Sequence, residues 1–228
     1  MGIIILVLVI IGIKSYFIRR EFNDSLYGIV SGNSLKSTIY DKGNYGEYLT
    51  FLQLEKLEGN NKVLCNLYIP KQDGSTTEID LIMINKSGIY VFESKNYSGW
   101  IFGDEKNKNW TQTFKGGKKN HFFNPIWQNK SHISALASVI SDIDNTCFYS
   151  YIIFSERCTL KSILATSSRT FILKRNELLS RLRMELSINY EILSEEKINK
   201  IYYDLVRYCR VNEAVKEEHI KSIKVRRV

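Results

Sequence analysis

The clearest pattern along the chain is a pair of apolar runs separated by a short polar segment. Residues 76–84 and 89–95 are rich in β-branched and aromatic side chains, and the polar tetrapeptide at 85–88 is a turn signal. The two runs are therefore predicted to form a β-hairpin. A turn centred within 85–88 places Asp80 directly opposite Glu93, with their Cβ atoms about 5 Å apart on one face of the sheet.

The rest of the chain carries further helix and strand signals. Apolar positions at helical spacing predict helices at 45–57, 124–140, 177–184 and 194–210. Short β-branched and aromatic runs predict strands at 62–69, 98–102, 110–113, 148–154 and 169–173. This succession indicates an α/β fold: a mixed β-sheet flanked by helices, with a helical C-terminal elaboration.

The N-terminal segment differs from the remainder because it is almost entirely apolar. Residues 3–11 are continuously aliphatic, Lys14 follows, and Arg19 and Arg20 close the segment. A helix extended to residue 18 would be about 27 Å long, enough to span a bilayer if Lys14 reaches the interface. A basic leader and a cleavage site of small residues are absent, so a cleaved signal peptide is not indicated.

These features predict a single N-terminal transmembrane helix at residues 1–20. The basic flank predicts a single-pass protein of the cell membrane whose C-terminal part is cytoplasmic. The polar segment 21–43 is interpreted as a linker, and 44–155 as the main domain. Residues 156–228 are then a C-terminal α/β elaboration that ends in a basic tail.

Composition narrows the classes of partner and chemistry. The chain has 228 residues, 44% of them hydrophobic, and a net charge of +8, which favours an anionic partner such as nucleic acid or acidic lipid. A basic drift without function is the alternative. No glycine-rich phosphate loop is present, so nucleotide hydrolysis is unsupported. The histidines His121, His132 and His219 are too scattered along the chain for a zinc site.

The predicted hairpin concentrates charge at its open end. Period-two alternation puts Lys95 on the same face as Glu93, about 7 Å further along the strand. Two carboxylates that face each other, here Asp80 and Glu93, repel and require a cation between them. A divalent metal with oxygen ligands meets that requirement, and Lys95 would complete an acidic–cationic site.

Three other places are candidates for the same site. Glu47 shares a helix face with apolar residues, which is unusual for a carboxylate without a partner; a half-solvated residue of the first helical turn is the alternative. Gln128 stands in the first turn of a helix that begins at Asn124-Pro125, where it would orient a water or a phosphate; an ordinary surface glutamine is the alternative. The loop with Lys115, Lys118 and Lys119 either binds phosphates or is ordinary solvated surface; these three lysines are the candidates for binding nucleic acid.

The ordered set of these residues resembles a known family. Asp80 followed by Glu93-Ser94-Lys95 is similar to the PD-(D/E)xK nuclease core, and residues 91–104 read VFESKNYSGWIFGD, as in the NERD (nuclease-related) domain. Two further motifs of that family occur in the same order: GE at 46–47 upstream and NPIWQN at 124–129 downstream. Ser94 stands where this family more often has an apolar residue, at a position that should face away from the site.

The resemblance implies a restriction-endonuclease-like core and a metal-dependent nuclease. Asp80 and Glu93, with Glu47 and the backbone carbonyl of Ser94, would hold Mg²⁺ or Mn²⁺. Lys95 would orient water or stabilise the transition state, with Gln128 assisting. DNA is implied as substrate rather than RNA. The alternative is a non-catalytic nucleic-acid-binding or membrane-proximal scaffold module that retains the nuclease fold.

Overall fold

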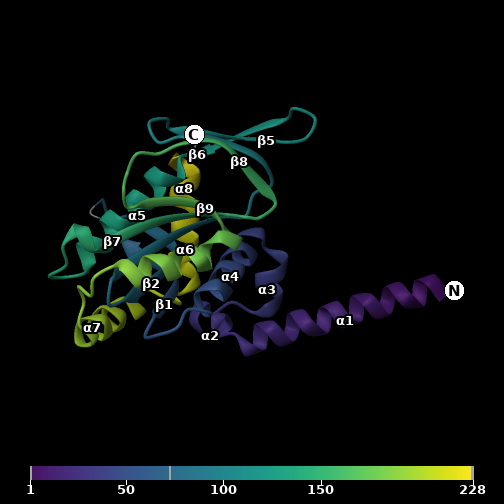
Figure 1. The fold of residues 1–228 in the computed structure, drawn as a ribbon, viewed down its shortest axis with the longest axis horizontal. Helices are drawn as coiled ribbons and strands as arrows, with labels where there is room; N and C mark the ends of the chain where they lie inside the picture. The colour runs from purple at the N-terminus through teal and green to yellow at the C-terminus, as the bar shows by residue number, and fades with distance from the viewer. Residues whose placement is uncertain (1, 72, 227–228) are drawn as a thin grey trace.

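The computed structural model describes residues 2–71 and 73–226. Its centre is a five-stranded sheet of order β1-β2-β3-β7-β9 (Figure 1). β1 to β3 are antiparallel, whereas β3, β7 and β9 run parallel to one another. The strands are β1 (Lys62–Pro70), β2 (Thr76–Asn85), β3 (Gly88–Lys95), β7 (Phe148–Phe154) and β9 (Thr170–Lys174). The predicted mixed sheet is confirmed.

The predicted hairpin is formed by β2 and β3 with the predicted register. Asn85 pairs with Gly88, and the ladder continues to Leu81 with Phe92. Gly88 has φ 141°, and a Cβ there would come within 2.5 Å of the backbone oxygen of Cys147, so only glycine fits this turn. The turn therefore fixes which residues meet at the open end of the hairpin.

A second sheet of four strands, in the order β6-β5-β4-β8, packs beside the first. Its strands are β4 (Gly99–Asp104), β5 (Asn109–Thr113), β6 (Lys119–Phe123) and β8 (Cys158–Leu164). Only β4 and β5 were predicted. One face of this sheet is buried, since Ile101 and Trp110 pack against Ile152 and Phe154 of the central sheet.

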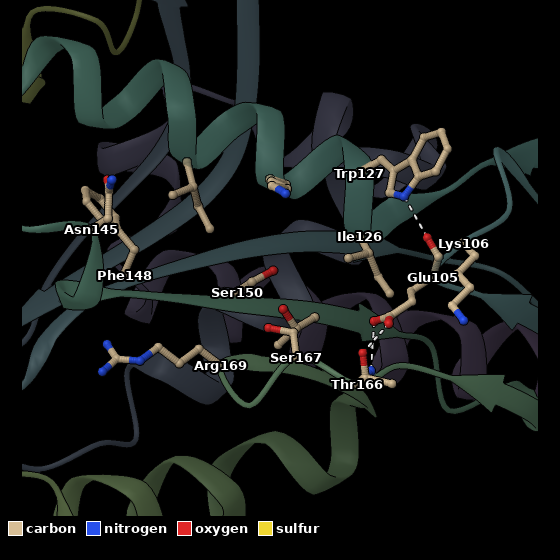
Figure 2. A pocket seen from close by; sticks show the side chains of 13 residues that line it. Glu105, Lys106, Ile126, Trp127, Asn145, Phe148, Ser150, Thr166, Ser167 and Arg169 are labelled. Carbon is tan, nitrogen blue, oxygen red and sulfur yellow. Dashed lines mark hydrogen bonds between the residues drawn. The ribbon is translucent and has the colours of Figure 1, made fainter.

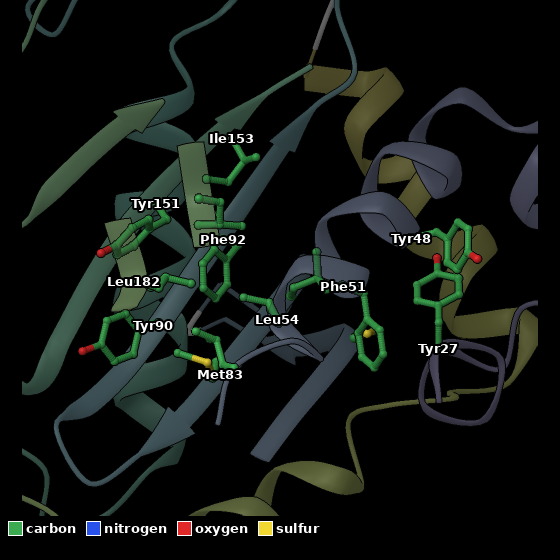
Figure 3. Packing of buried hydrophobic residues seen from close by; sticks show 14 of the residues in the cluster. Tyr27, Tyr48, Phe51, Leu54, Met83, Tyr90, Phe92, Tyr151, Ile153 and Leu182 are labelled. Atoms are coloured by element: carbon green, nitrogen blue, oxygen red, sulfur yellow. The ribbon is translucent and has the colours of Figure 1, made fainter. Parts of the chain in front are cut away.

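Helices cover both faces of the five-stranded sheet. On one face α4 (Lys42–Leu54) and α6 (Arg175–Ile188) supply Phe51, Leu54 and Leu182, which pack with Phe92 and Tyr151 of the strands (Figure 3). On the opposite face lie α5 (Pro125–Val139) and α7 (Glu195–Val206). Burial of each large apolar side chain stabilises the fold by about 1.5–3 kcal/mol, so the two layers hold the sheet rigidly.

The N-terminal part of α5 bears on the site and begins as predicted. The side chain of Asn124 accepts a hydrogen bond from the backbone N–H of Ile126, and Pro125 occupies the first helical position. The amide of Asn124 also donates to the backbone carbonyl of the last residue of β4 and to two carbonyls in the loop that follows. This capping residue thus fixes the start of α5 against the second sheet.

Residues 21–43, interpreted as a linker, are folded against the domain instead. They include α2 (Tyr27–Ser31) and α3 (Leu35–Tyr40). Tyr27 is fully buried, with its ring 5.2 Å from that of Tyr48 and 5.5 Å from that of Phe51. The polar composition of the segment gave no indication that Tyr27 would pack in the core.

The predicted membrane anchor is not supported. Residues 2–24 form one helix, α1 (Gly2–Asp24), which extends away from the domain to the N-terminus (Figure 1). Yet within the described residues no helix combines the length and the apolar character needed to cross a membrane. The physical reason is the charge distribution: the aliphatic run 3–11 is about 14 Å long, and Lys14, Arg19 and Arg20 follow within the same helix.

The C-terminal part of the chain contains helices, as predicted, and also adds a strand to each sheet. β8 pairs with β4 in the four-stranded sheet, and β9 pairs with β7 in the five-stranded one. The last helix, α8 (Glu213–Arg226), was not predicted and contains most of the basic segment 221–228. Residues 227–228 of that segment lie outside the described residues.

Candidate active site

The charged end of the hairpin begins where the β2–β3 ladder stops. Asp80 and Glu93 are the residues that follow the last pair, Leu81 with Phe92. Here the backbone N–H of Ser94 donates to Oδ2 of Asp80, at 2.7 Å, in place of a ladder hydrogen bond. The two strands therefore separate at this point, and their acidic side chains lie at the opening.

Lys95 is held between a strand neighbour and a helix. Its Nζ donates to Oε1 of Glu93 at 2.5 Å and to Oε1 of Gln128, in the first turn of α5, at 3.1 Å. The side chains of Glu93 and Lys95 are 2% and 14% exposed. The structure thus brings together three of the predicted site residues.

The charges of this pair follow from their mutual stabilisation. Burial is the largest influence and alone would lower the pKa of Lys95, but the surrounding groups, Glu93 first among them, together outweigh it and the pKa is raised. Burial alone would raise the pKa of Glu93, but Lys95 and then His132 outweigh it and the pKa is lowered. Both groups are therefore charged at neutral pH.

His132 is a site residue that the sequence analysis set aside. It stands one turn after Gln128 in α5, is 4% exposed, and its Nε2 lies 3.0 Å from Oε2 of Glu93. An ionised carboxylate only accepts hydrogen bonds, so Nε2 must donate. Nδ1 lies 2.8 Å from the hydroxyl oxygen of Thr77 on β2. The spacing of Gln128 and His132 on one helix face was the signal that could have found it.

Among the described residues, no ion pair holds the carboxyl group of Asp80 or that of Glu47. Burial, then the charges of Glu93 and Glu47, raises the pKa of Asp80 well above its ordinary value. Burial, then the charges of Glu78 and Glu93 among others, raises the pKa of Glu47 to about 8. Within the described residues, the buried Oε2 of Glu47 has no hydrogen-bond partner. The acidic groups destabilise one another's charged forms.

Whether a metal fits can be tested on this donor set. Across residues 2–71 and 73–226, no three His, Cys, Asp or Glu side chains converge into a preformed metal site. Mg²⁺, however, is usually held by one or two carboxylates and keeps several waters. The unpaired oxygen of Glu47 and the repulsion that Asp80 experiences are features that a divalent cation would relieve. The carboxylate oxygens present therefore suit a divalent cation that prefers oxygen ligands.

Ser94 contacts Asp80 through its backbone N–H. Its side chain faces away from Lys95, as predicted, and its Oγ lies 3.3 Å from Oγ1 of Thr50 on α4. A Cβ at Gly46 would come within 2.8 Å of the Asn96 side chain, so α4 approaches β3 closely at this point. That approach brings the first turns of α4, which carry Glu47, to the end of β3.

A cleft of about 470 Å³ opens at the site. Asp80, Gln128 and His132 line it, together with Lys108 and Trp127. The predicted nucleic-acid contacts Lys115, Lys118 and Lys119 are not part of its lining. They lie around the turn between β5 and β6, at the end of that hairpin remote from Lys108, and all three are exposed.

A larger cavity of about 610 Å³ lies on another side of α5 and contains none of the predicted catalytic side chains (Figure 2). Lys106, Lys130 and Arg169 bring positive charge to its lining. Trp127 borders both cavities, and its indole N–H donates to the backbone oxygen of Glu105 at 2.7 Å. The indole ring therefore separates the site from this basic cavity.

Comparison with known proteins assigns the sequence to a family. Residues 42–155 match the family model described as NERD, nuclease-related domain. An uncharacterized protein from Bacillus anthracis is 34% identical over 184 residues, which cover 80% of this chain and 84% of the relative. No solved structure matches. The family match contains Glu47, Asp80, Glu93, Lys95 and Gln128, and the chain belongs to the NERD, or nuclease-related domain, family.

Proposed function

We propose that this protein is a metal-dependent nuclease that hydrolyses phosphodiester bonds in nucleic acid, with DNA as the preferred substrate. One observation carries the proposal. A buried ammonium group, that of Lys95, is aligned by Glu93 and Gln128 at the point where two strands separate, beside the second carboxyl group, that of Asp80. Membership of the nuclease-related family supports it, and the preference for DNA comes from the resemblance to PD-(D/E)xK nucleases.

The metal would be held by carboxylate oxygens. Asp80 and Glu93 are the proposed ligands, with Glu47 and the backbone carbonyl of Ser94 as further donors. A bound Mg²⁺ or Mn²⁺ would supply Lewis acidity toward the scissile phosphate and favour deprotonation of a water. Because Glu47 and Asp80 repel other carboxylates in the metal-free protein, this cation would also remove an unfavourable interaction.

Lys95 supplies a fixed positive charge. Its ammonium group has three donors, two of which point at Glu93 and Gln128. The third is left for a phosphate oxygen or for the attacking water. Because the group is almost fully buried and already oriented, its interaction with charge that develops on the phosphate requires little reorganisation.

His132 acts on Glu93 and is a positioning residue. Its Nε2–H fixes one carboxylate oxygen of Glu93, while Lys95 fixes the other. Thr77 in turn orients the imidazole ring. Hydrogen-bond partners of this kind hold a metal ligand in its productive orientation.

The test is cleavage by the full chain of labelled DNA and RNA of one sequence, each with Mg²⁺, Mn²⁺ or EDTA. We expect DNA to be cleaved with either metal and not with EDTA. Lys95→Met should abolish most of the cleavage, whereas Lys200→Met on the exposed surface of α7 is a matched control that should not change it. Cleavage in EDTA, or full activity of Lys95→Met, would contradict the proposal.

A non-catalytic nucleic-acid-binding module is the second candidate. The observation in its favour is that both carboxylate oxygens of Glu93 already have partners, as in a structural cluster. This candidate predicts that the full chain binds DNA with an unchanged affinity in Mg²⁺ and EDTA and leaves it intact. The same assay therefore separates the two.

A further inference from the structure

The four-stranded sheet leaves one of its faces uncovered, and that face carries large aromatic rings. Trp100 and Phe102 of β4 are 47% and 38% exposed, whereas Ile101 between them is fully buried. We call this the outer face and define it by Trp100 and Phe102 on β4, Lys119, His121 and Phe123 on β6, and Lys161 on β8. Adjacent exposed rings of this size mark an interaction surface.

The register shows how the outer face is arranged. Trp100 pairs with Thr113, which pairs with Lys119; Phe102 pairs with Thr111, which pairs with His121. Strands are spaced by about 4.8 Å, so each basic or imidazole side chain lies roughly 10 Å from its ring. The 3.1 Å contact between His121 Nδ1 and the Thr111 hydroxyl oxygen confirms that these side chains share a face.

Positive charge surrounds the rings. The ammonium group of Lys161 lies over the Trp100 ring, 5.5 Å from its centroid. Lys115 and Lys118 lie at the adjacent β5–β6 turn, next to Lys119. The acidic side chain at the end of β4, Asp104, accepts a hydrogen bond from the backbone N–H of Lys106. This combination is complementary to a polyanion with aromatic groups rather than to a purely apolar protein surface.

The outer face runs on to the candidate active site. Phe123 follows His121 at the next outward position of β6 and is 45% exposed. Its ring contacts Trp127 edge to face, with centroids 6.2 Å apart. Both rings line the cleft that contains Asp80. Exposed side chains therefore lead from the open sheet into the cleft.

We propose that the outer face binds single-stranded nucleic acid by base stacking and directs the strand into the cleft. Alternate residues on a strand are about 7 Å apart, which matches successive unstacked bases of an extended strand on Trp100 and Phe102. An exposed cation–π contact is weak, so Lys161 can leave the ring for the neighbouring phosphate when a base stacks there. A duplex hides the faces of its bases, so only an unpaired strand can use these rings.

The delivery of the strand to the cleft rests on the proposed nuclease function. The binding of the strand to the outer face is independent of cleavage. The test is fluorescence anisotropy of the full chain in EDTA with a labelled oligo(dT) of about 20 nucleotides and with a duplex of the same length. Trp100→Ala should weaken single-strand binding by about 5- to 100-fold, and adding Phe102→Ala should weaken it further. Duplex binding should not change.

Matched variants separate stacking from other causes. Trp100→Phe keeps an aromatic ring and should retain most of the affinity, whereas Trp100→Leu keeps only an apolar group and should lose it. Tyr203→Ala, which removes a ring that is 73% exposed on α7, should have no effect. Equal melting temperatures of the Trp100 variants would show that the fold is intact.

Several outcomes would overturn the proposal. Full affinity of Trp100→Leu, or an equal loss of duplex binding, contradicts stacking. Loss of binding only when Lys106 and Arg169 become Ala assigns the strand to the basic cavity of Figure 2 instead. A dimer that dissociates on Trp100→Ala assigns the outer face to a second copy of the chain. Wild-type protein that binds the strand but never cleaves it with Mg²⁺ contradicts the proposed function alone.

Discussion

The two sheets of this protein differ in which side chains they bury and which they expose. The five-stranded sheet is covered by helices on both faces, and the charges at the C-terminal end of its middle strand, β3, are buried: the side chain of Glu93 is 2% exposed and that of Lys95 14%. The four-stranded sheet is covered on one face only, and its outer face exposes Trp100 by 47%. The first sheet buries charged groups and the second exposes aromatic rings. Both arrangements cost folding free energy, so neither is explained by a gain in stability.

The comparison separates two kinds of functional surface. A buried charge must be paired, so Glu93, Lys95 and His132 hold one another in a fixed geometry. Exposed rings need no such partners, so Trp100 and Phe102 are free to exchange neighbours. Substitutions in the first region should therefore alter both stability and chemistry, and those in the second should alter binding alone.

The largest effect is expected for Lys95→Met. Removing a donor of preorganised charge should reduce the cleavage rate constant by about 100- to 1000-fold. The variant also leaves the buried carboxylate of Glu93 without its cation, which should lower the metal-free unfolding free energy by about 3–5 kcal/mol. Single-turnover kinetics and urea denaturation measure the two effects. Adding Glu93→Gln should restore stability but not cleavage; restored cleavage would contradict the assignment.

A smaller effect is expected for His132→Ala. Loss of the hydrogen bond to Glu93 should reduce metal affinity or kcat by about 10- to 100-fold. His132→Gln retains a donor on a side chain of similar reach and should recover part of the loss. Metal titrations and kcat measurements on the two variants provide the comparison. Equal defects in both variants would show that the imidazole ring itself, rather than its hydrogen bond to Glu93, is required.

The acidic groups of the first region predict a pH dependence of stability. Glu47 titrates near pH 4.3 when unfolded and at about 8 when folded, so the folded protein binds the proton more tightly. Its contribution is fully present below pH 4.3 and is lost as pH rises through about 8. The raised pKa of Asp80 likewise makes stability fall as pH rises. The lowered pKa of Glu93 has the opposite effect, because its contribution to stability is lost as pH falls below the pKa of the unfolded chain. Urea denaturation of the metal-free protein should show this decline, and Glu47→Gln should reduce it.

The smallest effect on the fold is expected for exposed lysines. Replacing Lys115, Lys118 and Lys119 together by Ala should reduce the salt dependence of nucleic-acid binding by up to about 3 units of slope. The unfolding free energy should stay within about 0.5 kcal/mol of wild type. Binding measured across a salt series gives the slope. An unchanged slope would assign these residues to ordinary solvated surface.

Much of the first region could be predicted from sequence because its constraints are local. The turn at 85–88 set the register, and strand alternation put Lys95 beside Glu93. The Asn124-Pro125 signal placed Gln128 in the first turn of α5. His132 was missed because its contact with Glu93 joins residues 39 positions apart, and the only local signal for it was its spacing from Gln128 on one helix face.

The second region could not be predicted in the same way. β6 and β8 have exposed side chains at most positions and no clear alternation of apolar and polar residues, and they became strands by pairing with β5 and β4. Which face of the sheet is covered depends on Ile152 and Phe154, which belong to another sheet. Likewise Tyr27 became a core residue through contacts with α4 that its polar surroundings did not suggest. Tertiary packing, not local propensity, decided these elements.

The central claim is that Asp80, Glu93 and Lys95 form a metal-dependent catalytic centre rather than a structural cluster. Thermal melting with and without Mg²⁺ or Mn²⁺ tests it most directly. At a metal concentration of about 100 Kd, wild type should gain about 2.7 kcal/mol, Asp80→Asn should gain nothing, and Lys95→Met should respond from a lower starting temperature. If metal leaves the wild-type melting temperature unchanged while Lys95→Met melts early, the three residues are a structural cluster and the nuclease proposal is wrong.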